Sequence, residues 1–128
     1  MRVLLDTHAF LWWLAGDRKL KASVRRIVDD PTTVVFVSAA SVWEIATKVR
    51  LGKLPGAASI ADDIGGAIAS QKFEPLGVSV AHAQRAGGLA IPHRDPFDRM
   101  LIAQSQLEDV PLVSNEKLFD HFGVTRIW

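Results

Sequence analysis

Cysteine is absent from the 128-residue sequence. Its absence excludes disulfides, thiolate metal ligands and cysteine nucleophiles, so a metal site must be built from oxygen and imidazole ligands. Long apolar runs are also missing, because no stretch approaches the roughly 18 residues that a membrane span needs. The first carboxylate, Asp6, comes too early in the chain for a signal peptide. We therefore expect a cytoplasmic protein without membrane association.

A strong excess of charge is lacking as well. The chain has 15 basic and 14 acidic residues and a net charge of +1. No whole-molecule field therefore attracts nucleic acid, and any contact with a polyanion must come from a local patch. The 48% apolar content suits one compact domain, which we expect to occupy residues 1–128.

Several catalytic motifs are not found. The glycine pairs at 65–66 and 87–88 follow helical patterns rather than strands, so they do not form a phosphate-binding loop. A serine-nucleophile motif is missing too. No two histidines flank a glutamate one helical turn apart, as some metal sites require. The four histidines are His8, His82, His93 and His121.

The apolar pattern alternates short strands with helices. Ser38 and Asp95 are suitable N-caps, and Pro96 suits the first position of a helix. The alternation favours an α/β fold with a parallel sheet, in which ligands bind beyond the carboxyl ends of the strands. Strands are expected at 3–5, 34–37, 73–78, 111–113 and 124–127, and helices at 9–14, 20–29, 39–51, 60–68, 80–87, 96–108 and 118–122.

Acidic residues gather near the carboxyl ends of these expected strands. Each has an ordinary explanation: a helix cap, an interaction with a helix dipole, or, for Glu44, a pair with Lys48 one turn later. Carboxylates crowded at one sheet edge nevertheless repel one another unless a cation neutralises them, and oxygen ligands suit Mg²⁺ or Mn²⁺. The sequence therefore predicts a shared divalent ion. The candidate acids are Asp6, Glu44, Asp95, Asp98 and Glu116.

Basic residues surround two of these acids. His93 and Arg94 directly precede Asp95, and Arg99 follows Asp98. Side chains of these types contact phosphates, so we predict substrate contacts from His93, Arg94 and Arg99. The alternative is a polar loop with solvated charges, which is the more common fate of arginine.

Three tryptophans, Trp12, Trp13 and Trp43, fall on expected helices. We expect all three to contribute to the core. The alternative is that such bulky aromatic side chains fill an interface with a partner.

Four segments form an ordered set along the chain: residues 4–8 (LLDTH), 38–45 (SAASVWEI), 93–104 (HRDPFDRMLIAQ) and 112–116 (LVSNE). Together they resemble the VapC-type toxins of the PIN-domain family, over essentially the whole chain. The resemblance implies a PIN-like three-layer α/β/α sandwich, with a central, mainly parallel sheet of four to five strands.

The same resemblance implies an activity and partners. The implied activity is that of a Mg²⁺-dependent endoribonuclease, with Mn²⁺ as a substitute for Mg²⁺. Such an enzyme acts as the toxin of a type II toxin–antitoxin system. A metal-activated water would hydrolyse RNA, leaving a 5′-phosphate and a 3′-hydroxyl. A cognate antitoxin and a homodimeric state are implied as well.

The resemblance also assigns roles to residues. Asp6, Glu44 and Asp98 match the family's first three metal-binding acids, and Asp95 and Ser114 are expected to support them. Glu116 stands where the family usually has aspartate, and it is the fourth expected catalytic and metal-binding acid.

Two other functions fit parts of the sequence. A catalytically silent PIN-like RNA-binding protein is consistent with Glu116 in place of aspartate. A receiver-like signalling domain also binds Mg²⁺ through acids at strand ends. It would need a further aspartate after a middle strand, but the third expected strand ends near Pro75.

Overall fold

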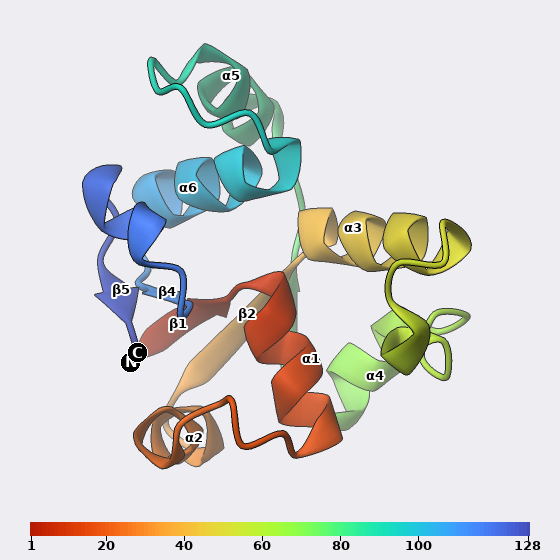
Figure 1. Cartoon of the computed structure of the whole chain (residues 1–128). Helices are drawn as coiled ribbons and strands as arrows, with labels where there is room; N and C mark the ends of the chain where they lie inside the picture. The colour runs from red at the N-terminus through yellow and green to blue at the C-terminus, as the bar shows by residue number, and fades with distance from the viewer.

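Five parallel strands form the central sheet of the computed structural model, which describes residues 1–128 (Figure 1). The strands lie in the order β3-β2-β1-β4-β5, and every neighbouring pair is parallel. The expected parallel sheet is therefore confirmed, with β1 at its centre. The strands are β1 Arg2–Leu5, β2 Val34–Ser38, β3 Glu74–Leu76, β4 Leu112–Val113 and β5 Arg126–Ile127.

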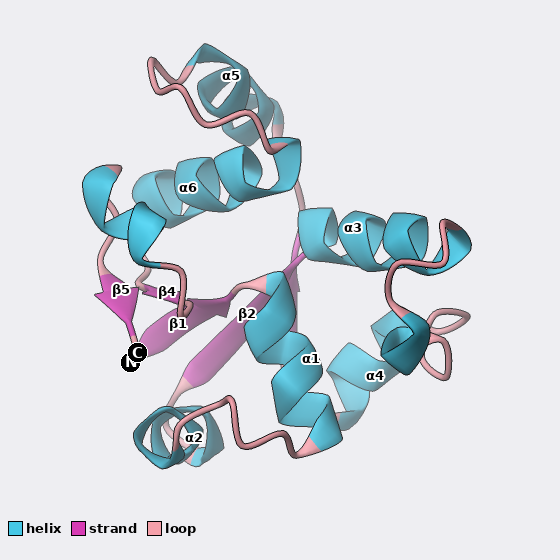
Figure 2. Ribbon diagram, viewed as in Figure 1, coloured by secondary structure: helices cyan, strands magenta, loops and turns pink.

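Helices cover both faces of the sheet, which confirms the three-layer sandwich (Figure 2). None of them combines the length and apolar character that crossing a bilayer requires. The α-helices are α1 Thr7–Ala15, α2 Ala22–Asp29, α3 Ala39–Arg50, α4 Ile64–Ser70, α5 Val80–Gly88 and α6 Pro96–Glu108, and the short 3-10 helices are η1 Pro55–Ala57 and η2 Lys117–His121.

The central strand β1 shows how the core is divided. Val3 and Leu5 belong to the larger apolar cluster, which includes side chains of α1, α2 and α4. Leu4 belongs to the smaller cluster, with side chains of α6 and η2. Successive residues of a strand point to opposite faces, so a continuous apolar run is typical of a strand covered on both sides.

Capping residues set the helix boundaries that matter for the site. The hydroxyl of Ser38 accepts a hydrogen bond from the N–H of Ala40, and α3 begins directly after Ser38. The carboxylate of Asp95 caps α6, which runs from Pro96 to Glu108 as expected.

Some elements differ from the expectation. The helix expected at 60–68 begins only at Ile64, because Asp63 caps it there by accepting from the N–H of Gly66. The strand expected at 73–78 is reduced to β3 at the sheet edge, where the missing N–H of Pro75 is tolerated. The expected helix at 118–122 is the 3-10 helix η2.

The tryptophans divide into two groups. Trp12 and Trp13 are partly buried and pack against the larger core, as expected. The expectation is wrong for Trp43, which is 62% exposed. The reason is its place on α3, where it shares the exposed stripe of Ala39, Ala46 and Arg50.

Candidate active site

The three central strands end in a row of polar residues. β1 pairs in register with β2 and β4 as far as Leu5, so the residues that follow these strand positions, Asp6, Ser38 and Ser114, lie at the same level. All three are buried. The chain runs from β1 to β2 and β3 on one side, then crosses back to β4 on the other. This edge is the topological switch point where α/β sheets bind ligands.

Asp6 is both a helix cap and a candidate site residue. Its Oδ1 accepts a hydrogen bond from the N–H of Ala9 at 2.7 Å, which caps α1. Burial raises the pKa of Asp6 to about 6, and the negative charge of Asp98 raises it too. The hydroxyl of Ser114, the N–H of Ala9 and the charge of His8 lower it, but burial dominates. A nearby cation would favour the ionised carboxylate.

Glu44 reaches the same edge from the second turn of α3 and is only 5% exposed. Its Oε1 accepts from the hydroxyl of Thr7 at 2.5 Å, and its Oε2 is bound by the ammonium group of Lys48. Thr7 directly follows Asp6, and its hydroxyl lies 2.9 Å from that of Ser41. The pair with Lys48 is therefore present, but Glu44 is buried rather than on an exposed face.

The N-terminus of α6 contributes Asp95 and Asp98. Oδ1 of Asp95 accepts from the N–H groups of Phe97 at 2.9 Å and Asp98 at 3.1 Å. Oδ2 of Asp98 lies 2.8 Å from Nε2 of His93. Burial raises the pKa of Asp98, and the charges of Asp95 and Glu44 add to the rise against the hydrogen bond from His93.

Lys48 connects these carboxylates electrostatically. Burial lowers the pKa of Lys48, but its hydrogen bond with Glu44 and the charges of Glu44, Asp95 and Asp98 raise it overall. The negative charge of Asp98 in turn raises the pKa of Asp6. Asp98 therefore lies within electrostatic reach of both Asp6 and Glu44. We call these three acids, which come from three distant segments, the acid cluster.

Other candidate residues lie differently. Glu116 is exposed, its N–H donates to the hydroxyl of Ser114 at 3.0 Å, and no hydrogen bond joins its carboxylate to the acid cluster. Arg94 is exposed on the loop before α6. Arg99, for which we predict a phosphate contact, instead donates five hydrogen bonds to backbone carbonyls. No N–H of its guanidinium group is left for a phosphate.

Thr7 and Ser41 take part in this network but are not among the residues predicted from the sequence. A signal for both was present. Thr7 directly adjoins Asp6, and Ser41 precedes Glu44 by three residues, which places Ser41 and Glu44 on one face of α3.

The acid cluster has the oxygen ligands that Mg²⁺ and Mn²⁺ prefer. It is not a finished metal site, because no three acidic or histidine side chains are arranged closely enough to hold an ion. Glu44 is bound by Thr7 and Lys48, and Asp98 is bound by His93. The donor set therefore fits a hard cation, but Glu44 must give up Lys48 to bind one. Asp98 can keep His93 on Oδ2, because no hydrogen bond occupies its Oδ1.

Comparison with known families agrees with this arrangement. The model of the PIN domain family matches residues 3–124. The chain belongs to the PIN domain family. Membership argues against the receiver-like alternative, and so does the strand order, because receiver domains have the order 2-1-3-4-5.

Individual relatives of this PIN protein are similar in sequence or in fold. Ribonuclease VapC16 of Mycobacterium tuberculosis is 41% identical over 66 residues, which are 50% of this chain and 47% of that relative. A toxin–antitoxin complex from Klebsiella pneumoniae contains a chain with 17% identity and a TM-score of 0.68, over 98% of this chain and 96% of that one. VapC20 of M. tuberculosis, a sarcin–ricin loop cleaving toxin, has 16% identity and a TM-score of 0.66, over 98% of each chain. At these identities the two structures establish the shared fold.

Proposed function

We propose that this PIN protein is a Mg²⁺-dependent endoribonuclease and the toxin of a toxin–antitoxin pair. The acid cluster carries the proposal. The charge of Glu44 acts on Asp98, the charge of Asp98 acts on Asp6, and Glu44 accepts a hydrogen bond from Thr7, which adjoins Asp6. Burial raises the pKa of two of these acids, Asp6 and Asp98, as expected for carboxylates that need a cation. RNA is the proposed substrate, since one relative is a ribonuclease and another cleaves the sarcin–ricin loop.

Asp6, Glu44 and Asp98 would hold the divalent ion, which is Mg²⁺ or its substitute Mn²⁺. When bound, such an ion stabilises charge on a phosphate and lowers the pKa of water, so that hydrolysis proceeds without a histidine base. Asp95 supports Asp98 by fixing the start of α6. Glu116 is proposed as a fourth acid from its place two residues after Ser114.

The neighbouring side chains orient the acid cluster. Thr7 fixes one oxygen of Glu44, and His93 fixes one oxygen of Asp98. The hydroxyl of Ser114 favours the ionised form of Asp6. Lys48 offsets part of the negative charge of Glu44, Asp95 and Asp98.

Cleavage of a labelled RNA by the purified protein tests this proposal. We expect cleavage with Mg²⁺, none with EDTA, and products that carry a 5′-phosphate. Glu44→Gln and Asp98→Asn should each lower the rate by about 100-fold or more, because each removes a charge that positions the ion. Asp29→Asn is the matched control, since Asp29 is an exposed acid at the end of α2.

Two outcomes would contradict the proposal. Cleavage that persists in EDTA would exclude a metal-dependent mechanism. RNA binding without cleavage under all metal conditions would favour the catalytically silent alternative, for which the exposed Glu116 is the supporting observation.

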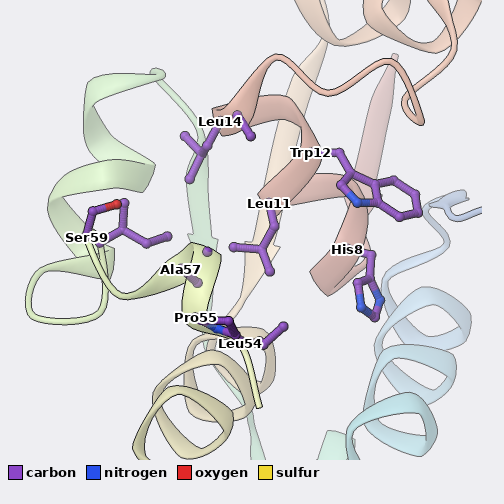
Figure 3. A pocket seen from close by; sticks show the side chains of 11 residues that line it. His8, Leu11, Trp12, Leu14, Leu54, Pro55, Ala57 and Ser59 are labelled. Atoms are coloured by element: carbon purple, nitrogen blue, oxygen red, sulfur yellow. The ribbon is translucent and has the colours of Figure 1, made fainter. Parts of the chain in front are cut away.

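An apolar pocket beside the acid cluster is the proposed contact for the antitoxin. The pocket measures about 310 Å³ and lies between α1 and the segment around η1 (Figure 3). Leu11 points from α1 toward Leu54 and Ala57 in this view. His8, two residues after Asp6, also lines the pocket. A partner segment with apolar side chains would therefore lie next to the site, and the Klebsiella complex supports such a partner.

A second apolar surface is the proposed homodimer interface. Trp43 is 62% exposed and packs edge-on against Phe97, with 4.9 Å between ring centroids. Both rings line a pocket of about 390 Å³ between α3, α5 and α6, together with Val78, which is 42% exposed. Large apolar side chains gathered on one exposed surface favour association, because a second copy would remove them from water.

A further inference from the structure

Arg99 is bound entirely to the backbone of its own chain. Its Nε, Nη1 and Nη2 atoms donate five hydrogen bonds of 2.7 to 3.3 Å. A guanidinium group has five N–H donors in a fixed plane, so all of its capacity is used. The acceptors are the carbonyl oxygens of Ala86, Gly87, Leu89, Ile91 and His93.

These carbonyls belong to one segment, residues 86–93, which leads from the end of α5 to the loop before α6. Residues 89–95 form no helix or strand. Among the backbone hydrogen bonds outside the helices and strands, none is accepted by any of these five carbonyl oxygens. Arg99 therefore supplies the hydrogen bonds that regular secondary structure supplies elsewhere, and without it the segment would have to bond to water.

His93, at the end of this segment, is held at two points by consecutive residues of α6. Its ring Nε2 lies 2.8 Å from Oδ2 of Asp98, and its carbonyl oxygen accepts from Nη1 of Arg99 at 2.9 Å. Fixing the backbone of His93 lowers the entropy that its ring loses when it binds Asp98. The hydrogen bond to Asp98 therefore depends on the bonds of Arg99.

We propose that Arg99 is a positioning residue of the acid cluster: by gathering the carbonyls of residues 86–93, it holds His93 against Asp98 and so fixes that carboxylate for a divalent ion. This inference rests on the proposed function, because it assigns Asp98 to a metal site. The planar set of five donors is the property that matters. Lysine has three donors on a flexible stem and cannot bond five separate carbonyls.

Mn²⁺ binding to the RNA-free protein, measured by electron paramagnetic resonance of the free ion, tests this role. Arg99→Met and Arg99→Lys should each weaken Mn²⁺ binding by roughly 10-fold, as expected for residues that orient metal ligands. His93→Ala should have a similar effect. The double variant Arg99→Met/His93→Ala should bind no more weakly than His93→Ala, because both changes remove the same contact.

Arg85→Met is the matched control. Arg85 is exposed on α5, near the same segment, and donates to Gln106 at 3.1 Å. We expect the Mn²⁺ affinity of this variant to stay within about twofold of that of the unchanged protein, because a surface substitution away from the site has only a small effect. Circular dichroism and thermal melts show which variants are folded. If Arg99→Met does not fold, Arg99→Lys and Arg99→Gln provide the same comparison.

A spectroscopic readout separates positioning from a purely structural role. The ¹⁵N resonance of His93 Nε2 should move in folded Arg99→Lys, because the ring loses its fixed contact with Asp98. Normal Mn²⁺ binding by Arg99→Lys would overturn the inference, since charge alone would then suffice. Additive losses in the double variant would overturn it as well. If the unchanged protein neither binds Mn²⁺ nor cleaves RNA, the proposed function fails instead.

Discussion

Removing the charge of Asp6 should stabilise the fold while it abolishes the proposed activity. Asp6 is 5% exposed and begins α1 by accepting from the N–H of Ala9. The amide introduced by Asp6→Asn has nearly the same volume and keeps a side-chain oxygen for this cap, but it has no charge to desolvate. The substitution therefore isolates the free energy of burying the carboxylate.

The size of the effect follows from the pKa of Asp6, which burial raises from 3.8 to about 6. Between these values the folded protein holds a proton that the unfolded chain has released, so the free energy of unfolding falls as pH rises. Above this range the penalty is complete, at about 3 kcal/mol. Below about pH 3 both states are protonated, and the penalty disappears.

Urea unfolding in EDTA, at pH 4 and pH 8, measures this penalty. At pH 8 we expect Asp6→Asn to be more stable than the unchanged protein by up to about 3 kcal/mol, or about 10 °C in Tm. At pH 4 the difference should shrink to about 0.6 kcal/mol. Asp63→Asn is the control, because Asp63 also caps a helix but is exposed. Its stability should change by no more than about 0.5 kcal/mol at either pH.

A different pH dependence would refute this reasoning. If Asp6→Asn is no more stable than the unchanged protein at pH 8, the carboxylate does not carry the burial penalty described here. An equal gain at both pH values would show that the gain comes from something other than ionisation. RNA cleavage by the same variant should be lost, since a site that needs a buried charge trades stability for activity.

Three further predictions concern single side chains. Asp95→Ala should lower the free energy of unfolding by about 1 kcal/mol in urea titrations, because the cap of α6 is lost; an unchanged midpoint would contradict this. Thr7→Val should lower the rate of RNA cleavage by roughly 10-fold, because Glu44 loses a hydrogen bond of 2.5 Å. An unchanged rate would show that Thr7 does not position Glu44. Trp43→Asp should convert a dimer into a monomer in light-scattering measurements. The control Leu107→Asp, at another exposed apolar residue, should remain a dimer. A dimer in both variants would place the interface elsewhere.

The fold could be predicted where local chemistry decides it. α6 is the clearest case, because an aspartate cap, a proline at the first helical position and an apolar stripe all indicate one helix. The central strands could also be predicted, since buried parallel strands give short, continuous apolar runs.

Features decided by distant contacts could not be predicted in the same way. The limits of β3 depend on its place at the sheet edge beside β2. The exposure of Trp43 depends on how α3 is rotated, which follows from burying Glu44 and Ile45. The place of a strand at the sheet edge leaves no periodic pattern in the sequence. In α3 the apolar pattern is ambiguous, because the apolar residues Trp43 and Ala46 lie on the exposed side.

In the candidate site, too, features set by local sequence could be predicted, whereas features set by distant contacts could not. The sequence predicts Asp6, Glu44 and Asp98 near one edge of the parallel sheet, because Asp6 follows a strand and the other two lie in the early turns of α3 and α6. Their joint role in binding a metal stays a prediction. The hydrogen bonds of Arg99 could not be predicted, because its five acceptors are backbone oxygens of a segment without regular structure. A sequence shows side chains, but it does not show where carbonyl groups converge.

Anomalous scattering from crystals grown with Mn²⁺ tests the central claim most directly. We predict a manganese peak among the carboxylates of Asp6, Glu44 and Asp98, with Glu44 released from Lys48 and with His93 still bonded to Asp98. No peak at that position, in a protein that cleaves RNA in the same Mn²⁺ solution, would contradict the claim.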